Sequence, residues 1–166
     1  MANSWCRSMS NAGRCIVIEG GEGAGKSRLL QALGERLRAG GREVVLTREP
    51  GGTALGEQIR SLVLRDLAVG DHLAELLLFE AARAHLVATV LRPALERGAL
   101  VLCDRFAASS IAYQGFGRGL GRDVVERANA IATGGLAPDL TLLLDLAVEA
   151  GLARRAGDGA ANHFDR

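Results

Sequence analysis

The sequence predicts an α/β fold in which a parallel β-sheet carries helices on both faces. Short apolar runs alternate along the chain with longer segments whose apolar residues recur at helical spacing. This alternation favours strand–helix–strand units joined by right-handed crossovers. The chemically notable segments also follow the strands, at the edge where open parallel sheets bind their ligands. These segments are residues 20–27, 48–52, 104–114 and Asp145.

Length and composition suit a single folded domain. The chain has 166 residues, 48% of them apolar, and a net charge of +1, which excludes a disordered chain and a strongly basic nucleic-acid module. No apolar run reaches the length of a membrane span. Cys6, Cys15 and Cys103 show no CxxC spacing, so the sequence predicts neither a disulfide frame nor a zinc site, and a reducing cytoplasm is the expected compartment.

The first part of the chain predicts a leader, two strands and two helices. Residues 1–14 are polar and lack the apolar core of a signal peptide, so they are expected to be a disordered leader, with Met9 as an alternative start. Residues 15–19 form a short β-branched run and predict a buried strand. A helix over 26–40, a second strand over 43–47 and a helix over 54–64 follow, with the turn "REPGG" after the second strand.

The second part begins with a long helix over residues 71–98. Asp71 is its expected N-cap, Pro93 its expected kink and Gly98 its stop. Residues 99–103 and 140–144 predict two more buried strands, separated by a loop and a helix over 123–132. The sequence "VEAGLARRAG" then predicts a last helix.

The segment "GGEGAGKS" predicts a phosphate-binding loop between the first strand and the first helix. It matches the pattern G-x-x-x-x-G-K-[ST], whose glycines let backbone N–H groups converge on phosphate oxygens. The only lysine of the chain, Lys26, would reach the β- and γ-phosphates, and Ser27 would ligate Mg²⁺. A chance glycine-rich turn is the alternative, which the strand–helix context disfavours. The predicted ATP-binding residues are Gly20, Gly21, Glu22, Gly23, Ala24, Gly25, Lys26 and Ser27.

A phosphate-binding loop serves switches, motors and kinases alike, so the rest of the chain must distinguish them. The guanine-reading pattern "NKxD" of GTPases is absent from the sequence. An AAA-type ATPase would be longer and would carry an acidic pair after a strand, whereas the strand at 99–103 is followed by "DR". Asp104 is placed to hold Mg²⁺ through water and Arg105 to neutralise phosphate charge, with a surface ion pair as the alternative.

Five segments then occur in one order: "EGGEGAGKS", "TREPGGT", "ELLLFEAARA", "DRFAASSIAYQGFGRGL" and "PDLTLLLD". On these, residues 15–166 resemble the bacterial thymidylate kinases, for which "TREPGGT" and "AYQGxGRG" are specific. The resemblance implies a P-loop nucleoside monophosphate kinase fold and an enzyme that transfers the γ-phosphate of ATP to dTMP, giving dTDP in dTTP synthesis. It also implies Mg²⁺ as cofactor, a cytoplasmic homodimer, and no nucleic-acid or membrane partner.

The resemblance further implies an acceptor site for dTMP. Phe79 resembles the ring stacked on thymine, and Arg83, on the same helix face, resembles the base-edge donor; taken alone, Phe79 fits core packing equally well. Ser110, Tyr113 and Gln114 resemble the thymidine pocket wall, with Tyr113 crowding the place of a ribose 2′-hydroxyl. The remaining implied contacts are Glu22 to the sugar 3′-hydroxyl, Arg48 and Arg105 to the dTMP phosphate, Glu49 near metal and sugar, and Pro50 in the turn.

The resemblance also implies catalytic arginines in a lid, a segment that closes over the phosphate-binding loop. Gly23 stands where another branch of the family places an arginine, and bacterial members supply lid arginines instead; such charge stabilises phosphoryl transfer. The implied catalytic residues are Lys26, Arg105, Arg154, Arg155 and Arg166, and the implied metal ligands are Ser27 and Asp104.

One departure from the family concerns the sheet. The resemblance implies five strands, but the sequence predicts only four, and the chain ends within the lid. The expected domain over 15–166 is therefore incomplete, either a fragment or a natural short form, with poor turnover expected. Two other readings stay open: a nucleotide-binding but catalytically impaired domain, and a related P-loop kinase for another small acceptor, which "TREPGG" and "AYQG" disfavour.

Overall fold

The computed structural model describes residues 13–66 and 71–156, without the side chains of 65, 66, 155 and 156. Its four strands form one parallel sheet, as predicted, and the order of the strands is β2-β3-β1-β4. The strands are β1 (Arg14–Gly20), β2 (Val44–Arg48), β3 (Leu100–Asp104) and β4 (Leu140–Leu144). Within the described ranges, no helix has the length and apolar character needed to cross a bilayer.

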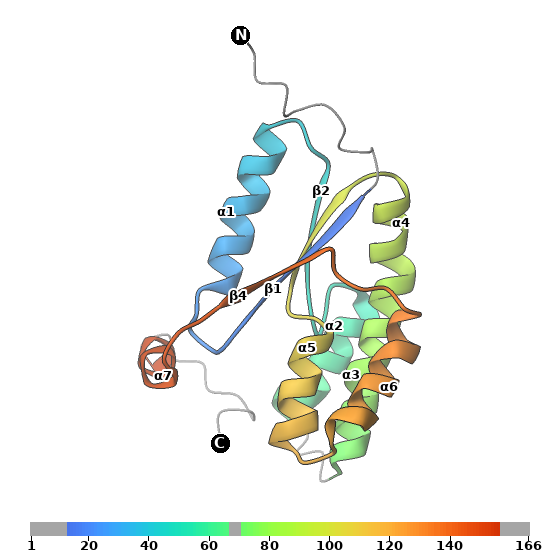
Figure 1. Cartoon of the computed structure of the whole chain (residues 1–166), viewed down its shortest axis with the longest axis vertical. Helices are drawn as coiled ribbons and strands as arrows, with labels where there is room; N and C mark the ends of the chain where they lie inside the picture. The colour runs from blue at the N-terminus through green and yellow to red at the C-terminus, as the bar shows by residue number, and fades with distance from the viewer. Residues whose placement is uncertain (1–12, 67–70, 157–166) are drawn as a thin grey trace.

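Helices cover both faces of this sheet. Figure 1 shows α1 (Lys26–Ala39) beside one face, and α3 (His72–Leu86), α4 (Arg92–Glu96) and α6 (Arg122–Thr133) on the other side. The remaining helical segments are α2 (Ala54–Ser61), η2 (Leu62–Asp66), η3 (Val87–Leu91), α5 (Ala107–Ser110), η4 (Ile111–Gly117) and α7 (Val148–Ala156), where η marks a turn of π type.

Alternation along the strands divides the core into two layers. Ile18 and Leu102 face α1 and pack with Leu30. Their neighbours Val17 and Val101 point to the opposite face, against the helices that end the long 72–96 segment. Both layers are needed because successive residues of a strand point to opposite faces. Packing on both faces therefore holds the sheet, and with it the carboxyl ends of its strands, in place relative to the helices.

The long helix expected over 71–98 is present in three parts. Asp71 caps it as predicted, since its Oδ1 accepts a 2.7 Å hydrogen bond from the Ala74 amide. The backbone widens to a π-type turn at Val87–Leu91, just before Pro93 in the first turn of α4. Proline lacks an N–H and crowds the preceding turn, which accounts for this local change. Gly98 has a φ of 86° and follows the last turn, as predicted for the stop.

Two predictions about regular structure are wrong. The segment expected to be a loop after 99–103 is helical in α5 and η4. The sequence did not predict these helices, because the serines and glycines of the segment leave no apolar residues at helical spacing. Contacts from other elements stabilise the segment instead, including a 3.2 Å hydrogen bond from Asn129 Nδ2 to the Ala107 carbonyl. The strand over 140–144 is not buried: β4 is an edge strand, and Leu143 is 70% exposed.

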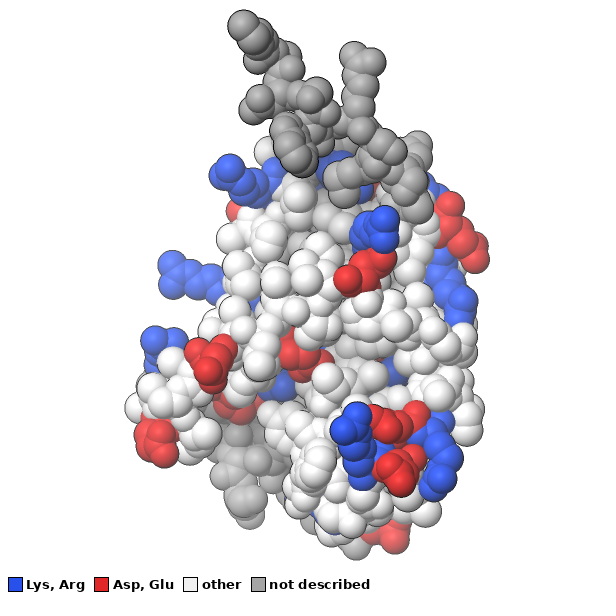
Figure 2. Space-filling model, viewed as in Figure 1, with Lys and Arg blue, Asp and Glu red and all other residues white. Residues whose placement is uncertain are grey.

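The described surface mixes charges of both signs. On the face that Figure 2 draws, Lys and Arg side chains lie among Asp and Glu rather than in a separate region. The exposed ion pairs of the described residues include Arg122–Glu126 at 2.7 Å and Arg97–Glu43 at 2.7 Å. The described part of this face therefore offers no basic stripe of the kind that binds a phosphate backbone.

Candidate active site

The phosphate-binding loop lies between β1 and α1, as predicted. Gly23 and Gly25 have φ angles of 68° and 89°, a conformation that favours glycine. Lys26 is buried, and its Nζ donates to the Gly20 carbonyl at 3.0 Å and the Gly21 carbonyl at 2.7 Å. Burial, and after it the nearby Arg105 guanidinium, lower the pKa of Lys26. The ammonium is therefore held inside the loop, at the N-terminus of α1.

Ser27 and Asp104 lie together beside this loop. The Ser27 hydroxyl donates a 2.7 Å hydrogen bond to Asp104 Oδ2, across the carboxyl ends of β1 and β3. A hydroxyl and a carboxylate supply the oxygen donors that Mg²⁺ prefers, and Mg²⁺ usually takes only one or two carboxylates when substrate phosphates complete its shell. The two predicted metal ligands thus fit the ion.

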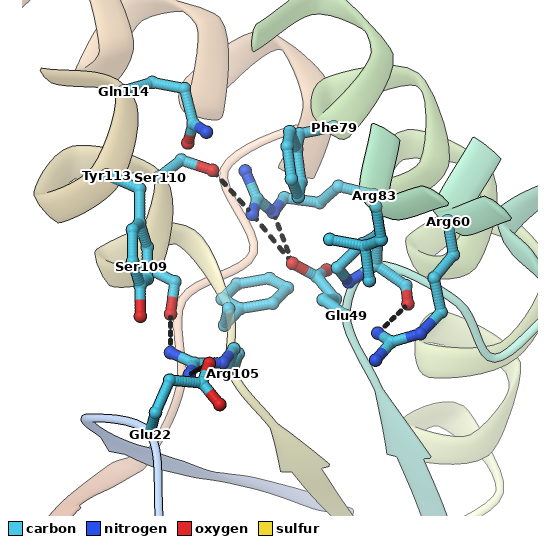
Figure 3. A pocket seen from close by; sticks show the side chains of 13 residues that line it. Glu22, Glu49, Arg60, Phe79, Arg83, Arg105, Ser109, Ser110, Tyr113 and Gln114 are labelled. Carbon is cyan, nitrogen blue, oxygen red and sulfur yellow. Dashed lines mark hydrogen bonds and ion pairs between the residues drawn. The ribbon is translucent and has the colours of Figure 1, made fainter. Parts of the chain in front are cut away.

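A pocket opens next to the loop, at the carboxyl edge of the sheet (Figure 3). Three segments that the sequence singled out meet here: the phosphate-binding loop, the turn after β2 and the segment after β3. All the predicted acceptor residues except Arg48 line it. The lining residues are Glu22, Glu49, Pro50, Arg60, Leu64, Phe79, Arg83, Arg105, Phe106, Ser109, Ser110, Tyr113 and Gln114.

Arg83 forms the buried floor of this pocket. Its guanidinium donates to Glu49 Oε2 at 2.8 Å and to the Ser110 hydroxyl at 3.0 Å, and it also pairs with Glu80 and Asn129. Burial opposes the charge of Arg83, but the two carboxylates together raise its pKa. Burial raises the pKa of Glu49 to about 7, against the opposing effect of Arg83. The Arg83 guanidinium therefore donates hydrogen bonds to two buried carboxylates, those of Glu49 and Glu80. The second carboxylate oxygen of Glu49, Oε1, has no hydrogen-bond partner among the described residues.

Arg105 connects the pocket to the phosphate-binding loop. Its φ of 72° is unusual for a residue other than glycine. The backbone is held by a 3.0 Å hydrogen bond from the Arg105 amide to the Ile18 carbonyl. The guanidinium donates to Glu22 Oε1 at 3.0 Å and to the Ser109 hydroxyl at 3.2 Å, and it stacks over the Tyr113 ring at 5.3 Å. A strained conformation at a charged residue in a pocket is typical of a functional site.

Two charged residues of the site were missed in the sequence. Glu19, at the end of β1, is buried and accepts hydrogen bonds from the Phe106 amide at 2.9 Å and the Ser109 hydroxyl at 2.7 Å. It therefore fixes the start of the helix that carries Ser109. Arg60, on α2, donates to the Pro50 carbonyl at 2.9 Å and lines the pocket. The sequence offered one signal for both residues, a charge next to apolar residues. Glu19 ends the otherwise apolar run over 15–19, and Arg60 lies one residue after the buried Ile59.

Two of the predicted arginines, Arg48 and Arg154, do not line the pocket. Arg48 is exposed and pairs with Glu57 at 3.0 Å. Arg154, on α7, donates a long 3.4 Å hydrogen bond to the Gly23 carbonyl, so it lies beside the phosphate-binding loop. The side chain of Arg155, and Arg166 as a whole, lie outside the described residues.

Comparisons with known proteins agree with this geometry. The family model described as thymidylate kinase matches residues 18–166. A protein named thymidylate kinase from Deinococcus radiodurans is 52% identical over 154 residues, covering 93% of this chain and 75% of that protein. Another of that name from Pseudomonas fluorescens is 54% identical over 155 residues, covering 93% and 74%. The crystal structure of thymidylate kinase from Ehrlichia chaffeensis superposes with a TM-score of 0.77 and 36% identity, covering 89% and 80%.

Proposed function

The chain belongs to the thymidylate kinase family, and we propose that its phosphate-binding loop and the adjoining pocket are the ATP and dTMP sites of that reaction. It is an ATP-dependent thymidylate kinase, which transfers the γ-phosphate of ATP to dTMP and releases dTDP and ADP. The assignment of individual residues below is the proposal.

One contact carries this assignment. Glu22 belongs to the phosphate-binding loop and Arg105 follows β3, yet both line one pocket and form a 3.0 Å ion pair. A pocket that shares a wall with a phosphate-binding loop places an acceptor directly beside the γ-phosphate. The lining combines aromatic rings with convergent polar and charged side chains, which suits a nucleoside that carries a phosphate.

Within the pocket we assign Phe79 to stacking on thymine and Arg83 to its edge. Arg105, Arg60 and Arg48 are assigned to the acceptor phosphate. Arg105 and Arg60 already line the pocket, whereas Arg48 would have to exchange Glu57 for the phosphate. Glu22 is assigned to accept a hydrogen bond from the sugar 3′-hydroxyl. Glu49 and Pro50 are assigned to the floor of the pocket, and its wall is formed by Ser110, Tyr113 and Gln114. The side chain of Tyr113 stacks against Arg105, which supports a place beside the sugar.

On the donor side we assign Gly20–Ser27 to the phosphates of ATP. Lys26 would leave the two loop carbonyls and pair with the β- and γ-phosphates, which carry negative charge that the carbonyls lack. Ser27 and Asp104 would hold Mg²⁺, which when bound offsets phosphate charge during transfer. Arg154 lies next to Gly23 and is assigned, with Arg155 and Arg166, to charge that closes over the transferred phosphoryl group.

Four further assignments complete the proposal: a domain over 15–166 after a leader, a homodimer, a cytoplasmic location, and no nucleic-acid partner. Exposed apolar side chains on one helix, Leu73 at 47% and Leu77 at 55%, support a homodimer. The near-neutral net charge of +1 supports the absence of a nucleic-acid partner.

The test is a coupled assay of ADP formation with dTMP, dUMP, dCMP and thymidine each offered as acceptor. We expect turnover with dTMP, weaker turnover with dUMP and none with thymidine, because the arginines of the pocket need an acceptor phosphate. Arg60→Ala should raise the KM for dTMP on the order of tenfold or more while leaving the KM for ATP unchanged, since a charged hydrogen bond is lost on the acceptor side alone. ATP binding without ADP formation for every acceptor would contradict the proposal.

A further inference from the structure

Gln114 and Glu75 form a buried pair behind one wall of the pocket. Gln114 Nε2 donates a 2.8 Å hydrogen bond to Glu75 Oε1, and each residue is only 1% exposed. Arg118, one turn after Gln114, closes the group through an ion pair of 3.3 Å between its Nη2 and Glu75 Oε2. Gln114 lines the pocket, but Glu75 does not. The side chain of Glu75 is therefore linked to the pocket lining through its hydrogen bond with Gln114.

The chemistry of Glu75 decides which way the Gln114 amide points. A carboxylate that pairs with an arginine accepts hydrogen bonds and donates none, whereas a primary amide has one donating and one accepting end. The nitrogen of Gln114 must therefore face Glu75, and the oxygen must face away. Figure 3 shows this oxygen directed toward Ser110 and the interior of the pocket. Among the described residues, none donates a hydrogen bond to Gln114 Oε1.

We propose that Glu75 is a positioning residue for base selection: it fixes the Gln114 amide so that the pocket presents an acceptor to the N3–H of thymine. This inference rests on the proposed function, in which the pocket holds dTMP. Thymine and uracil carry a donor at N3, but cytosine carries a lone pair there. Cytosine would place two acceptors against one another in a desolvated site, which is a strong basis for rejection. An amide free to turn over would lose this selectivity, because its nitrogen would suit cytosine.

The matched variants are Glu75→Gln and Glu75→Asp. Glu75→Gln keeps the size of the side chain but can donate as well as accept, so it no longer fixes the Gln114 amide. Glu75→Asp stays acceptor-only and keeps the sign of the interaction, although it is shorter. Glu126→Gln is the control, because Glu126 pairs with Arg122 on the surface of α6 and is not one of the residues that line the pocket.

The measurement is kcat and KM for dTMP, dUMP and dCMP at saturating ATP, together with the KM for ATP and the melting temperature. For Glu75→Gln we expect the ratio of kcat/KM for dUMP over dCMP to fall on the order of tenfold, mainly through KM, as for one misplaced hydrogen bond. Glu75→Asp should retain most of the wild-type ratio, and Glu126→Gln all of it. The KM for ATP should stay unchanged throughout.

A purely structural role for Glu75 would lower the melting temperature of Glu75→Gln and leave the dUMP over dCMP ratio intact, which would overturn the proposal. If Glu75→Gln does not fold, competition binding on the wild-type protein still decides: dTMP methylated at N3 should bind far more weakly than dTMP, and equal binding would overturn the proposal. Failure of the proposed function looks different, because the wild-type protein would then phosphorylate none of the three nucleotides.

Discussion

The backbones of Gly23 and Gly151 lie in direct contact. A Cβ added to Gly23 would clash with the Gly151 carbonyl oxygen, and a Cβ added to Gly151 would clash with the Glu22 carbonyl oxygen. The first comes from the phosphate-binding loop and the second from α7, the helix that carries Arg154. The contact leaves no room for a side chain at position 23, so any arginine near the loop has to come from elsewhere. It gives a physical reason for assigning that role to α7.

Gly23→Ala should separate α7 from the phosphate-binding loop. The φ of 68° costs an alanine about 1–2 kcal/mol, and the contact with Gly151 adds to it. We expect a lower melting temperature without nucleotide. Gly21→Ala is the matched control, since a Cβ at Gly21 has nothing within 4 Å, and it should leave this melting temperature unchanged. Equal melting temperatures for the two variants would mean that α7 does not depend on the contact.

Lys26→Ala should abolish turnover and preserve the fold. Among the described residues, Lys26 donates only to carbonyls of its own loop. Removing one electrostatic contact to reacting phosphates costs on the order of 10²-fold or more in rate. Far-ultraviolet circular dichroism and ADP formation measure the two effects. Arg28→Ala, at an exposed position of the same helix, is the control and should keep its activity. A folded Lys26→Ala protein with full activity would contradict the assigned role of the loop.

Phe79→Ala should weaken dTMP binding far more than ATP binding. The side chain lines the pocket and also packs against the cluster of Ile59, Val63 and Ala82. A lost stack costs roughly 1–3 kcal/mol at the base only, and calorimetric titration with each ligand measures the difference. Phe116→Ala is the control, since Phe116 is 71% exposed and does not line the pocket. Equal weakening for both ligands would favour the core role alone.

The sheet and the phosphate-binding loop could be predicted because their signals are local. Short β-branched runs, the spacing of Leu30 from its neighbours, and a glycine pattern ending in Lys26 each lie within one segment. The start of the long helix was also readable, because the Asp71 cap acts on an amide three residues away. Segments whose structure depends on neighbours in sequence are the ones that sequence reasoning places well.

The helical stretch over 107–117 could not be predicted, because partners far away in sequence stabilise it. Gln114 is held by Glu75, 39 residues earlier, and Asn129 bonds the Ala107 carbonyl from 22 residues later. The same holds for the site: Glu19 is recognisable as functional only once Ser109, 90 residues later, lies beside it. The resemblance supplied the acceptor residues that spacing alone does not reveal.

The buried charges beneath the pocket predict a pH-dependent stability. Burial raises the pKa of Glu49 from 4.5 to about 7. Between these two values, the folded protein holds a proton on Glu49 that the unfolded chain has released. The free energy of unfolding should therefore fall as pH rises through this window, because the folded state binds more protons. Glu80 shifts in the same direction, by burial, and adds to the slope.

Glu49→Gln should make this slope shallower, since glutamine cannot release the proton. Thermal unfolding of the wild-type protein and the variant, at steps across that window, measures the difference. Glu57→Gln is the control. Burial acts to raise the pKa of Glu57, but the hydrogen bond from the Gly52 amide and the pairing with Arg48 outweigh it and lower this pKa below its usual value. Glu57 therefore titrates below the window. That variant should retain the wild-type slope. If Glu49→Gln retained it as well, Glu49 would be ionised in the folded protein throughout, with Arg83 compensating fully for its burial.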